Sequence, residues 1–461
     1  MALLGALLLV FQLLVRPQEF VPELHAYGLL NAAAALGVLG IVVETALGKQ
    51  ALPWTPQMPW LGVLVAWCFL VTVRQLGLEG LSVVWEFVGL SAIAMLVVAF
   101  AVRTAARWYT IVAALVAIGL AIAGTCIHQG HQQAECIVID TSTGGDRAGE
   151  GVPDGRHCED SYTCERQGKA NTTYACEKVG LFGTFTEGAR VRWRGTLGDP
   201  NELALALGAT MPFCFAFSSA KKNGGVSLLC ALAVAVALWC VVLTRSRGGQ
   251  LIVLTVFGGY FVHRYATKGF LLAAMLALPV LLLGGRAGEE AQSSSLERVD
   301  LLYDGMAMVR AHPLLGVGTG QFMNHTWNGL TAHNSYVLTA AELGLPGSLF
   351  WLMLVYTSIK IPWVVATRPP PGLDSAIVAF ALALVVSFAG ILVGAFFLSF
   401  SYKSVLFIFF GLAGAMYGVV KRASPSFEVR VALKEVALVA VADAALLALV
   451  LVYSHFAEAH A

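Results

Sequence analysis

Charged residues are scarce in this chain of 461 residues. Asp, Glu, Lys and Arg make up 12% of it, about half of the roughly 25% that is typical of soluble domains. Apolar residues make up 58%, and the mean hydropathy is +0.75. The charges nearly cancel, to a net +1, and form no long basic tract, which argues against a nucleic-acid partner. We therefore expect an all-α polytopic membrane protein.

Several catalytic motifs are also missing. The sequence contains no Walker loop, no HExxH motif, no nucleophile elbow and no DxD-type carboxylate pair on a short external loop near the start. These absences argue against a phosphate-cradling NTPase, a zinc protease, a serine hydrolase and metal-assisted catalysis. We expect neither a metal site nor a cofactor.

Long apolar runs predict about twelve transmembrane helices, because one crossing needs about 20 residues. The predicted spans are 2–15, 26–47, 58–78, 81–102, 109–127, 201–219, 226–243, 250–265, 269–284, 336–365, 375–398 and 404–420. A last run, 436–454, is either a thirteenth span or a helix on the membrane surface. Asp443 in its middle counts against a crossing.

Basic residues at alternate span ends predict the orientation, since Lys and Arg favour the cytoplasmic side. Those assigned to the cytoplasm are Lys49, Arg103, Arg107, Lys221, Lys222, Arg264, Lys268, Arg368, Lys421 and Arg422. Two large loops, 128–200 and 285–335, then lie outside. The domains are three membrane blocks, 1–127, 201–284 and 336–461, separated by these loops.

Four of the nine cysteines share the first outer loop, and they are Cys136, Cys158, Cys164 and Cys176. Such clustering is typical of disulfides in an oxidising compartment, which agrees with the predicted orientation. Free thiols or a metal site are the alternatives, but Cys158 and Cys164 lack the CxxC spacing of a zinc ribbon. We favour disulfides and leave their pairing open.

The outer loop ends in a basic segment, RVRWRGTLGDPNELALAL (190–207). Asp199, Pro200 and Asn201 form a good helix start, because an Asp or Asn side chain caps exposed amides and Pro fits the first turn. Capping does not explain the arginines at alternate positions, which would all point one way from an extended strand. Guanidinium groups in a row suit a diphosphate. These arginines are Arg190, Arg192 and Arg194.

A second basic segment, TRSRGGQL (244–251), joins two apolar runs on the same outer side. Arg245 and Arg247 stand beside Gly248-Gly249, which would allow the backbone to approach a ligand. The amides of the following helix start would add to an anion site. A tight turn with two snorkelling arginines is the simpler interpretation. Together with the first segment, the pair favours anion binding.

The segment 296–347 is the most polar stretch within the apolar part of the chain. An amphipathic helix ends at His312-Pro313, and GVGTG (316–320) follows as a flexible turn. His333-Asn334 then directly precedes an apolar run that contains Glu342. A neutral imidazole can act as a general base or orient a hydroxyl. A carboxylate within a span is expensive, so Glu342 either pairs with an arginine for structure or takes part in the site.

Three motifs in order resemble the bacterial O-antigen ligase and O-antigen polymerase superfamily. They are RGTLGDPNELA (194–204), SRGG (246–249), and a pattern running from Arg298 through HPLLGVG (312–318) and His333-Asn334 to Glu342-Leu343-Gly344 and Gly347. The motifs cover about 190–347, and the span pattern extends the similarity to most of the chain. The cysteine-rich insertion, 128–185, is a departure that the shared motifs do not require.

The resemblance implies a GT-C-like glycosyltransferase in the bacterial inner membrane, with its active site facing the periplasm. Such enzymes transfer a glycan from undecaprenyl diphosphate to an acceptor hydroxyl, without a nucleotide sugar or a required metal. By position, Arg194 and Arg247 would hold the diphosphate, and His333 would activate or orient the acceptor. The supporting substrate-binding residues would be Arg192, Arg245, Arg298, Asn201, Asn334 and Glu342.

The acceptor remains open within this superfamily. A ligase uses lipid A-core, a polymerase uses another glycan repeat unit, and a third type of member glycosylates protein; we favour the ligase. The rival from another class is a transporter or flippase of an anionic lipid-linked substrate. Transporters place charges on broken helices at mid-membrane, often in two related halves. Here the charges gather in outer loops, which disfavours transport.

Overall fold

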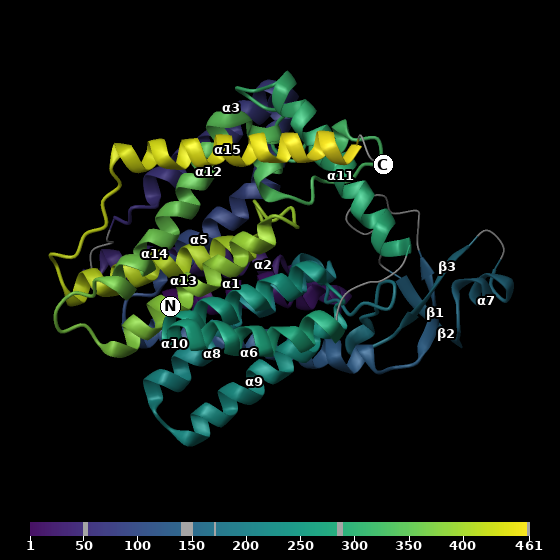
Figure 1. The fold of residues 1–461 in the computed structure, drawn as a ribbon, viewed down its shortest axis with the longest axis horizontal. Helices are drawn as coiled ribbons and strands as arrows, with labels where there is room; N and C mark the ends of the chain where they lie inside the picture. Colours follow the sequence, from purple (N-terminus) through teal and green to yellow (C-terminus); the bar gives the residue numbers. More distant parts are fainter. Residues whose placement is uncertain (49–53, 140–150, 170–171, 284–288, 459–461) are drawn as a thin grey trace.

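A computed structural model describes residues 1–48, 54–139, 151–169, 172–283 and 289–458 (Figure 1). The predicted cytoplasmic Lys49 and the start of the 285–335 loop fall outside these residues. Within the described part the chain is mainly helical. The N-terminal half contains α1 (Ala2–Leu14), α2 (Leu29–Ala46), α3 (Met58–Leu76), α4 (Gly80–Val84), α5 (Leu90–Ala101), α6 (Ala105–Gly130), α8 (Pro200–Lys221) and α9 (Gly224–Leu243).

The C-terminal half continues with α10 (Arg247–Leu283), α11 (Glu289–Ala311), α12 (Ser335–Thr367), α13 (Ser375–Ala395), α14 (Ser404–Ala423) and α15 (Leu433–Glu458). Within the described residues, ten stretches are long and apolar enough to cross a membrane. The polytopic, mainly helical architecture is therefore confirmed, and the number of crossings stays a prediction. The 436–454 run belongs to one such stretch, Leu433–Phe456.

Two of the predicted boundaries between spans coincide with breaks in the helices. Between α3 and α4, Gly77 has a φ of 66°, and a Cβ on Gly80 would lie 2.8 Å from the carbonyl oxygen of Thr72, so α4 folds back along α3. A one-turn π-helix, Trp85–Gly89, joins α4 to α5. Within α10, Ala266 is non-helical (φ 50°, ψ −129°), between the runs predicted at 250–265 and 269–284.

The core is built from helices packed side by side, with α14 on α5, α13 on α8 and α10, and α1 on α2. Small residues allow the closest of these contacts, as is common between membrane helices. A Cβ on Gly5 of α1 would lie 2.4 Å from Cα of Gly37 on α2. Any larger residue at position 5 would push the two helices apart.

Residues predicted to be cytoplasmic gather in one cluster around Glu44. Its carboxylate accepts a hydrogen bond from Arg107 Nη1 at 2.9 Å and lies 3.9 Å from Arg103 Nε. Arg422 Nη1 donates to the carbonyl oxygen of Arg103 at 2.8 Å. The chain's first residue, Met1, joins the cluster through its amino group, 3.4 Å from Glu44. These contacts place three predicted cytoplasmic cations at the same end of the molecule.

The all-α expectation is wrong for the loop 128–200, which is predicted to lie outside. This loop contains a three-stranded antiparallel sheet in the order β2-β1-β3, with the short helix α7 (Ser161–Arg166) beside it, at one end of the molecule (Figure 1). The strands are β1 (Ala134–Ile139), β2 (Gly151–His157) and β3 (Thr173–Lys178). The polar composition of the loop concealed β1 and β3, whose β-branched and aromatic residues favour strands.

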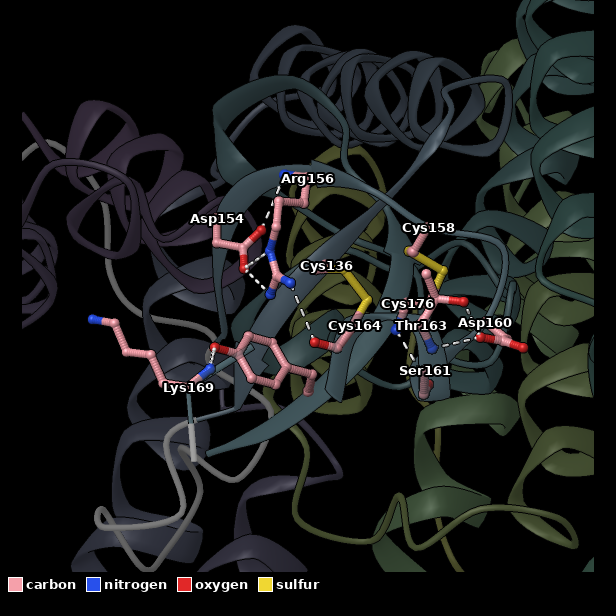
Figure 2. Close-up of a disulfide and its surroundings, with 11 residues drawn as sticks. Cys136, Asp154, Arg156, Cys158, Asp160, Ser161, Thr163, Cys164, Lys169 and Cys176 are labelled. Carbon is pink, nitrogen blue, oxygen red and sulfur yellow. Dashed lines mark hydrogen bonds and ion pairs between the residues drawn. A yellow bond between two sulfur atoms is a disulfide. The ribbon is translucent and has the colours of Figure 1, made fainter. Parts of the chain in front are cut away.

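The prediction of disulfides is confirmed, and Figure 2 shows both. Cys136 bonds to Cys164 on α7, and Cys158 bonds to Cys176. Cys136 and Cys176 face each other in the β1–β3 register but are not bonded to each other. The sequence could not have supplied this pairing, because the alternatives differ only in how the strands are arranged. The five cysteines outside this cluster are free thiols.

Reduction of the two disulfides is expected to unfold the sheet and leave the helical core intact. The bonds close loops with sequence separations of 28 and 18 residues, and a loop of this size stabilises a fold by ~3 kcal/mol. The only core of this sheet in the described residues is Cys136, Cys164 and Tyr174. Limited proteolysis with and without a reductant measures the effect. Equal cleavage within 134–178 under both conditions would contradict it.

Candidate active site at the outer ends of the helices

The two arginine motifs lie against each other, and Arg190 joins them. Its Nε donates to the carbonyl oxygen of Thr244 at 3.0 Å, and its Nη2 donates to Oδ1 of Asn201 at 3.0 Å. The backbone amide of Val191 donates to the carbonyl oxygen of Leu243 at 3.3 Å. Arg190 is only 8% exposed. It therefore fixes the start of α8 against the turn before α10.

The DPN sequence starts α8 as predicted. Asp199 is the N-cap residue, and its Oδ1 accepts from the backbone amide of Asn201 at 2.6 Å and from Asn201 Nδ2 at 2.7 Å. The side-chain amide of Asn201 therefore donates to Asp199, and its side-chain oxygen accepts from Arg190. These contacts make Asn201 part of the frame that joins the two motifs.

The three arginines contact different partners within the protein, and the single row that would bind a diphosphate stays a prediction. Arg192 lies over the Phe185 ring at 4.6 Å and 3.8 Å from Glu187. Arg194 Nη1 donates to the carbonyl oxygen of Glu19 at 2.8 Å, and its Nη2 donates to that of Gly183. The orientation of the Arg194 side chain is set by backbone carbonyls of neighbouring segments. The alternation of residues along a strand does not reveal such contacts. Arg194 therefore connects the region after α1 to the outer loop.

The TRSRGG turn presents its arginines at the start of α10. Arg245 and Arg247 are exposed, and Ser246 Oγ accepts from the amide of Gly249 at 2.9 Å. Gly248-Gly249 was expected to allow the backbone to approach a ligand. For Gly249 the structure shows a packing role instead. A Cβ there would lie 2.5 Å from Cβ of Ala204, so this glycine allows α10 to pack against α8. The turn is thus held close to the α8 start, with its two cations on the surface.

His333 is held in an unusual backbone conformation directly before α12. Its φ is +47°, in a region that side chains other than glycine rarely adopt. Its amide donates to Ser399 Oγ at 3.0 Å. The next residue, Asn334, caps α12 by accepting from the amides of Tyr336 and Val337, both at 3.0 Å. Backbone strain of this kind is often found at functional sites.

The loop Phe396–Lys403, between α13 and α14, supports this conformation. Asn334 Nδ2 donates to the carbonyl oxygen of Phe396 at 3.2 Å, and Ser335 Oγ donates to that of Leu398 at 2.6 Å. Since both polar ends of the Asn334 side chain bind the backbone, its observed role is to position His333. No sequence motif marked the 396–403 loop; a short polar SFSYKS stretch between two outer span ends was its only signal.

The electrostatic surroundings of His333 connect it to the other motifs. Burial lowers the pKa of His333 below its ordinary value, and the nearby cation Arg298 on α11 lowers this pKa further. The carboxylates of Asp199 and Glu297 act in the opposite direction. His333 is therefore neutral near physiological pH and can accept a proton. Asp199 belongs to the α8 start, so the His333 loop lies within electrostatic reach of the first arginine motif.

Residues 232–352 match the model of a family described as O-antigen ligase. This segment includes the TRSRGG turn, α11, His333 and Glu342. No curated protein matches the chain. Together with the ten stretches that are long and apolar enough to cross a membrane, the match supports a multi-pass membrane protein that is similar to O-antigen ligases over about a quarter of its length. The RGTLGDPN motif lies upstream of the matched segment.

Within the matched segment, Glu342 holds the GVGTG turn, and its role in binding a substrate stays a prediction. It is 2% exposed, and its Oε1 accepts from the amide of Phe322 at 3.1 Å. Its backbone carbonyl accepts from Gly318 at 2.9 Å. A Cβ on Gly316, whose φ is +61°, would lie 2.3 Å from that same carbonyl oxygen. In the described structure its Oε1 and its backbone carbonyl bind the amides of Phe322 and Gly318 rather than the arginine considered above.

Truncation of Glu342 is expected to destabilise the protein. Glu342→Ala leaves the buried amide of Phe322 without its acceptor, which costs about 1–3 kcal/mol. Glu342→Gln keeps an acceptor oxygen and should lose much less. Thermal unfolding of both variants in detergent measures the difference. If Glu342→Gln were as stable as the parent but inactive in transfer, Glu342 would have a chemical role instead.

Sequence reasoning missed two cations beside these motifs, Lys403 and Arg16. Lys403 Nζ lies 3.0 Å from Oε1 of the buried Glu202, at the start of α8. Arg16, after α1, lies 3.1 Å from Glu19, whose carbonyl oxygen binds Arg194. Each belongs to a short connection with no recognisable motif. Their proximity arises only when α1, α8 and α14 meet at their outer ends.

Proposed function

We propose that this protein is a metal-independent glycosyltransferase on the periplasmic side of the bacterial inner membrane. It moves a glycan from undecaprenyl diphosphate to an acceptor hydroxyl. The observation that carries this proposal is the junction of three motifs from distant parts of the chain. Arg190 joins the first two motifs, and the electrostatic influence of Asp199 and Arg298 on His333 joins the third.

The leaving group sets the main catalytic demand. Attack at the anomeric carbon of the sugar expels a lipid diphosphate, so the site must stabilise negative charge on its oxygens. Arg194 and Arg247 supply guanidinium forks for this purpose, with Arg192 and Arg245 adjacent to them in sequence. Cations already held in place stabilise the developing charge without the cost of reorganisation. The exposed position of Arg247 at the start of α10 also adds helix amides to the anion site.

His333 serves the acceptor. Because its pKa is lowered by burial and by Arg298, the imidazole is neutral and accepts the proton of the attacking hydroxyl. Ser399 and Asn334 hold the backbone on either side of it. Asn201, Asn334 and Glu342 act as positioning residues, while Arg298 tunes the imidazole.

We assign lipid A-core as the acceptor, which makes the reaction a ligation. A polymerase of the same superfamily would use the same donor and the same three motifs, and would differ only in the acceptor. The disulfide-bonded sheet lies on the predicted acceptor side and is absent from the shared motifs. It is therefore the segment most suited to distinguish acceptors.

A transfer assay with purified protein tests the proposal. Undecaprenyl diphosphate carrying a labelled glycan is mixed with lipid A-core, with a second glycan repeat unit, or with protein, in the presence of a chelator. We expect label on lipid A-core and no loss of rate with the chelator. Label on the repeat unit instead would make the protein a polymerase. Strict dependence on an added metal would contradict the mechanism.

A further inference from the structure

Trp327 lies on a tight turn, six residues before His333 in the sequence, and is 77% exposed. Two hydrogen bonds close the turn around it. Thr326 Oγ1 donates to the carbonyl oxygen of Leu330 at 3.0 Å, and the backbone amide of Leu330 donates to Asn328 Oδ1 at 3.1 Å. The residues on either side of Trp327 are therefore fixed, and its indole is exposed on an ordered segment.

The turn is tied to the surroundings of His333 at two points. Asn328 Nδ2 donates to Oε1 of Glu297 on α11 at 3.3 Å, and the same carboxylate is close enough to raise the pKa of His333. Ser399 Oγ accepts from Thr331 Oγ1 at 2.8 Å and from the His333 amide at 3.0 Å. Six extended residues span at most ~20 Å, and the hydrogen bonds across the turn shorten this reach. The indole therefore lies in the neighbourhood of the imidazole.

An exposed indole on an ordered turn indicates a binding surface. Fixing the turn costs conformational entropy, and leaving the ring in water forgoes the free energy of burying a large apolar side chain. Tryptophan is among the residues most enriched at the energetic centres of binding interfaces, and few are exposed where function does not need them. A ligand that covers Trp327 would therefore recover free energy that the free protein lacks.

The surroundings of Trp327 suit a hydrated ligand better than the hydrocarbon of a bilayer. A segment that lies in the membrane surface presents a broad apolar face. The other exposed residues of 321–332 in the described structure are Met323, Asn324, His325 and Gly329. One exposed thioether beside the indole makes a small apolar surface within a polar loop. Such a surface matches a ring that is apolar on one face and carries hydroxyl groups around its edge.

We propose that Trp327 stacks against a sugar ring of the acceptor glycan and holds the acceptor near His333, an inference that rests on the proposed function. The C–H groups on one face of a sugar carry partial positive charge, because the ring and hydroxyl oxygens withdraw electrons. The negative face of an indole attracts them, and the indole N–H can donate to a hydroxyl. Trp327 is thus a binding residue for the acceptor, while His333 acts on the attacking hydroxyl.

Transfer rates at varied lipid A-core concentration test this contact. Trp327→Ala should raise the KM for lipid A-core about tenfold and leave kcat and the KM for the donor unchanged, as expected for a residue that only binds the acceptor. Trp327→Phe keeps an aromatic face and should recover most of the loss, whereas Trp327→Leu keeps only apolar bulk and should not. Equal recovery by Trp327→Leu would overturn stacking on a sugar and indicate an apolar or membrane contact. Trp54, between α2 and α3, is 74% exposed, so Trp54→Ala is the matched control and should keep the parental KM.

Binding without transfer separates this inference from the proposed function. The lipid-free core oligosaccharide is added to purified protein in the absence of donor, and its contacts are measured by saturation-transfer NMR. The parent and Trp54→Ala should bind it, and Trp327→Ala should bind it about tenfold more weakly. If the parent bound no oligosaccharide, or if Trp327→Ala bound it and used lipid A-core as the parent does, the stacking contact would be wrong even though glycan transfer were observed. If the oligosaccharide bound through Trp327 but the parent transferred no glycan, the proposed function would fail and the sugar contact would stand.

Discussion

Replacement of His333 by alanine is expected to lower the rate of glycan transfer by about 10²–10⁴-fold, the usual contribution of a general base. The backbone of His333 is bound by Ser399 and by the Asn334 cap, so the fold around position 333 should survive. Transfer rates of purified protein and a thermal unfolding curve check both parts. A variant that kept its stability and its full rate would remove His333 from the mechanism.

The pH dependence of transfer gives a sharper form of this prediction. The neutral imidazole is the active form, so the rate should be constant at higher pH and fall as the pH drops through the pKa of His333. Since burial and Arg298 lower this pKa, the fall should begin below the pH expected for an ordinary histidine. Arg298→Gln removes the repelling cation and should raise this pKa, moving the acid limb to higher pH.

Arg310 on the same helix is the matched control for Arg298. It lies over the Tyr303 ring at 5.9 Å and does not contribute to the pKa of His333. Arg310→Gln should therefore leave the acid limb in place. Identical pH profiles for Arg298→Gln and Arg310→Gln would contradict the electrostatic role of Arg298.

Replacement of Arg247 by alanine is the second change with a large expected effect. Loss of one group that stabilises charge in a transition state costs roughly 10²–10³ in rate. Arg247→Lys keeps the charge but loses the planar fork that binds two oxygens, so it should recover only part of the rate. The backbone of the turn is held by Ser246 and Gly249 and should not change.

Arg166 on α7 provides the control for this second prediction. It is an exposed arginine on the same predicted side, but it lies in the disulfide-bonded domain and outside the three motifs. Arg166→Ala should transfer at the parental rate. If Arg166→Ala and Arg247→Ala lost activity equally, the effect would reflect overall surface charge rather than a specific diphosphate contact.

Much of the architecture could be predicted because it depends on local composition. The apolar runs predicted the mainly helical, polytopic fold, and the clustered cysteines predicted disulfides. The Asp199–Asn201 helix start also follows from short-range rules. The three motifs could be recognised in order, but the contact of the first two through Arg190 depends on the tertiary positions of the Thr244 carbonyl and the Asn201 side chain.

What the sequence did not reveal depends on tertiary contacts. The β-sheet of the 128–200 loop could not be predicted because the loop is mostly polar. The disulfide pairing could not be predicted either, since Cys136 and Cys176 face each other in the sheet but each bonds to a different cysteine. Asn334 and Glu342 are predicted to bind substrate, and the hydrogen bonds that their side-chain oxygens accept from backbone amides were not predicted. Such roles depend on which amides the fold buries. Lys403 and Ser399 were missed because their loop carries no motif.

Glycan transfer in sealed liposomes distinguishes a glycosyltransferase from a transporter. The purified protein is placed in sealed liposomes with undecaprenyl diphosphate that carries a labelled glycan, and lipid A-core is supplied on one side. We expect one molecule of undecaprenyl diphosphate to be released for each molecule of acceptor that is labelled. His333→Ala should abolish both the release and the labelling. Movement of the intact lipid-linked glycan across the bilayer, with no cleavage and no labelled acceptor, would contradict it and make the protein a transporter.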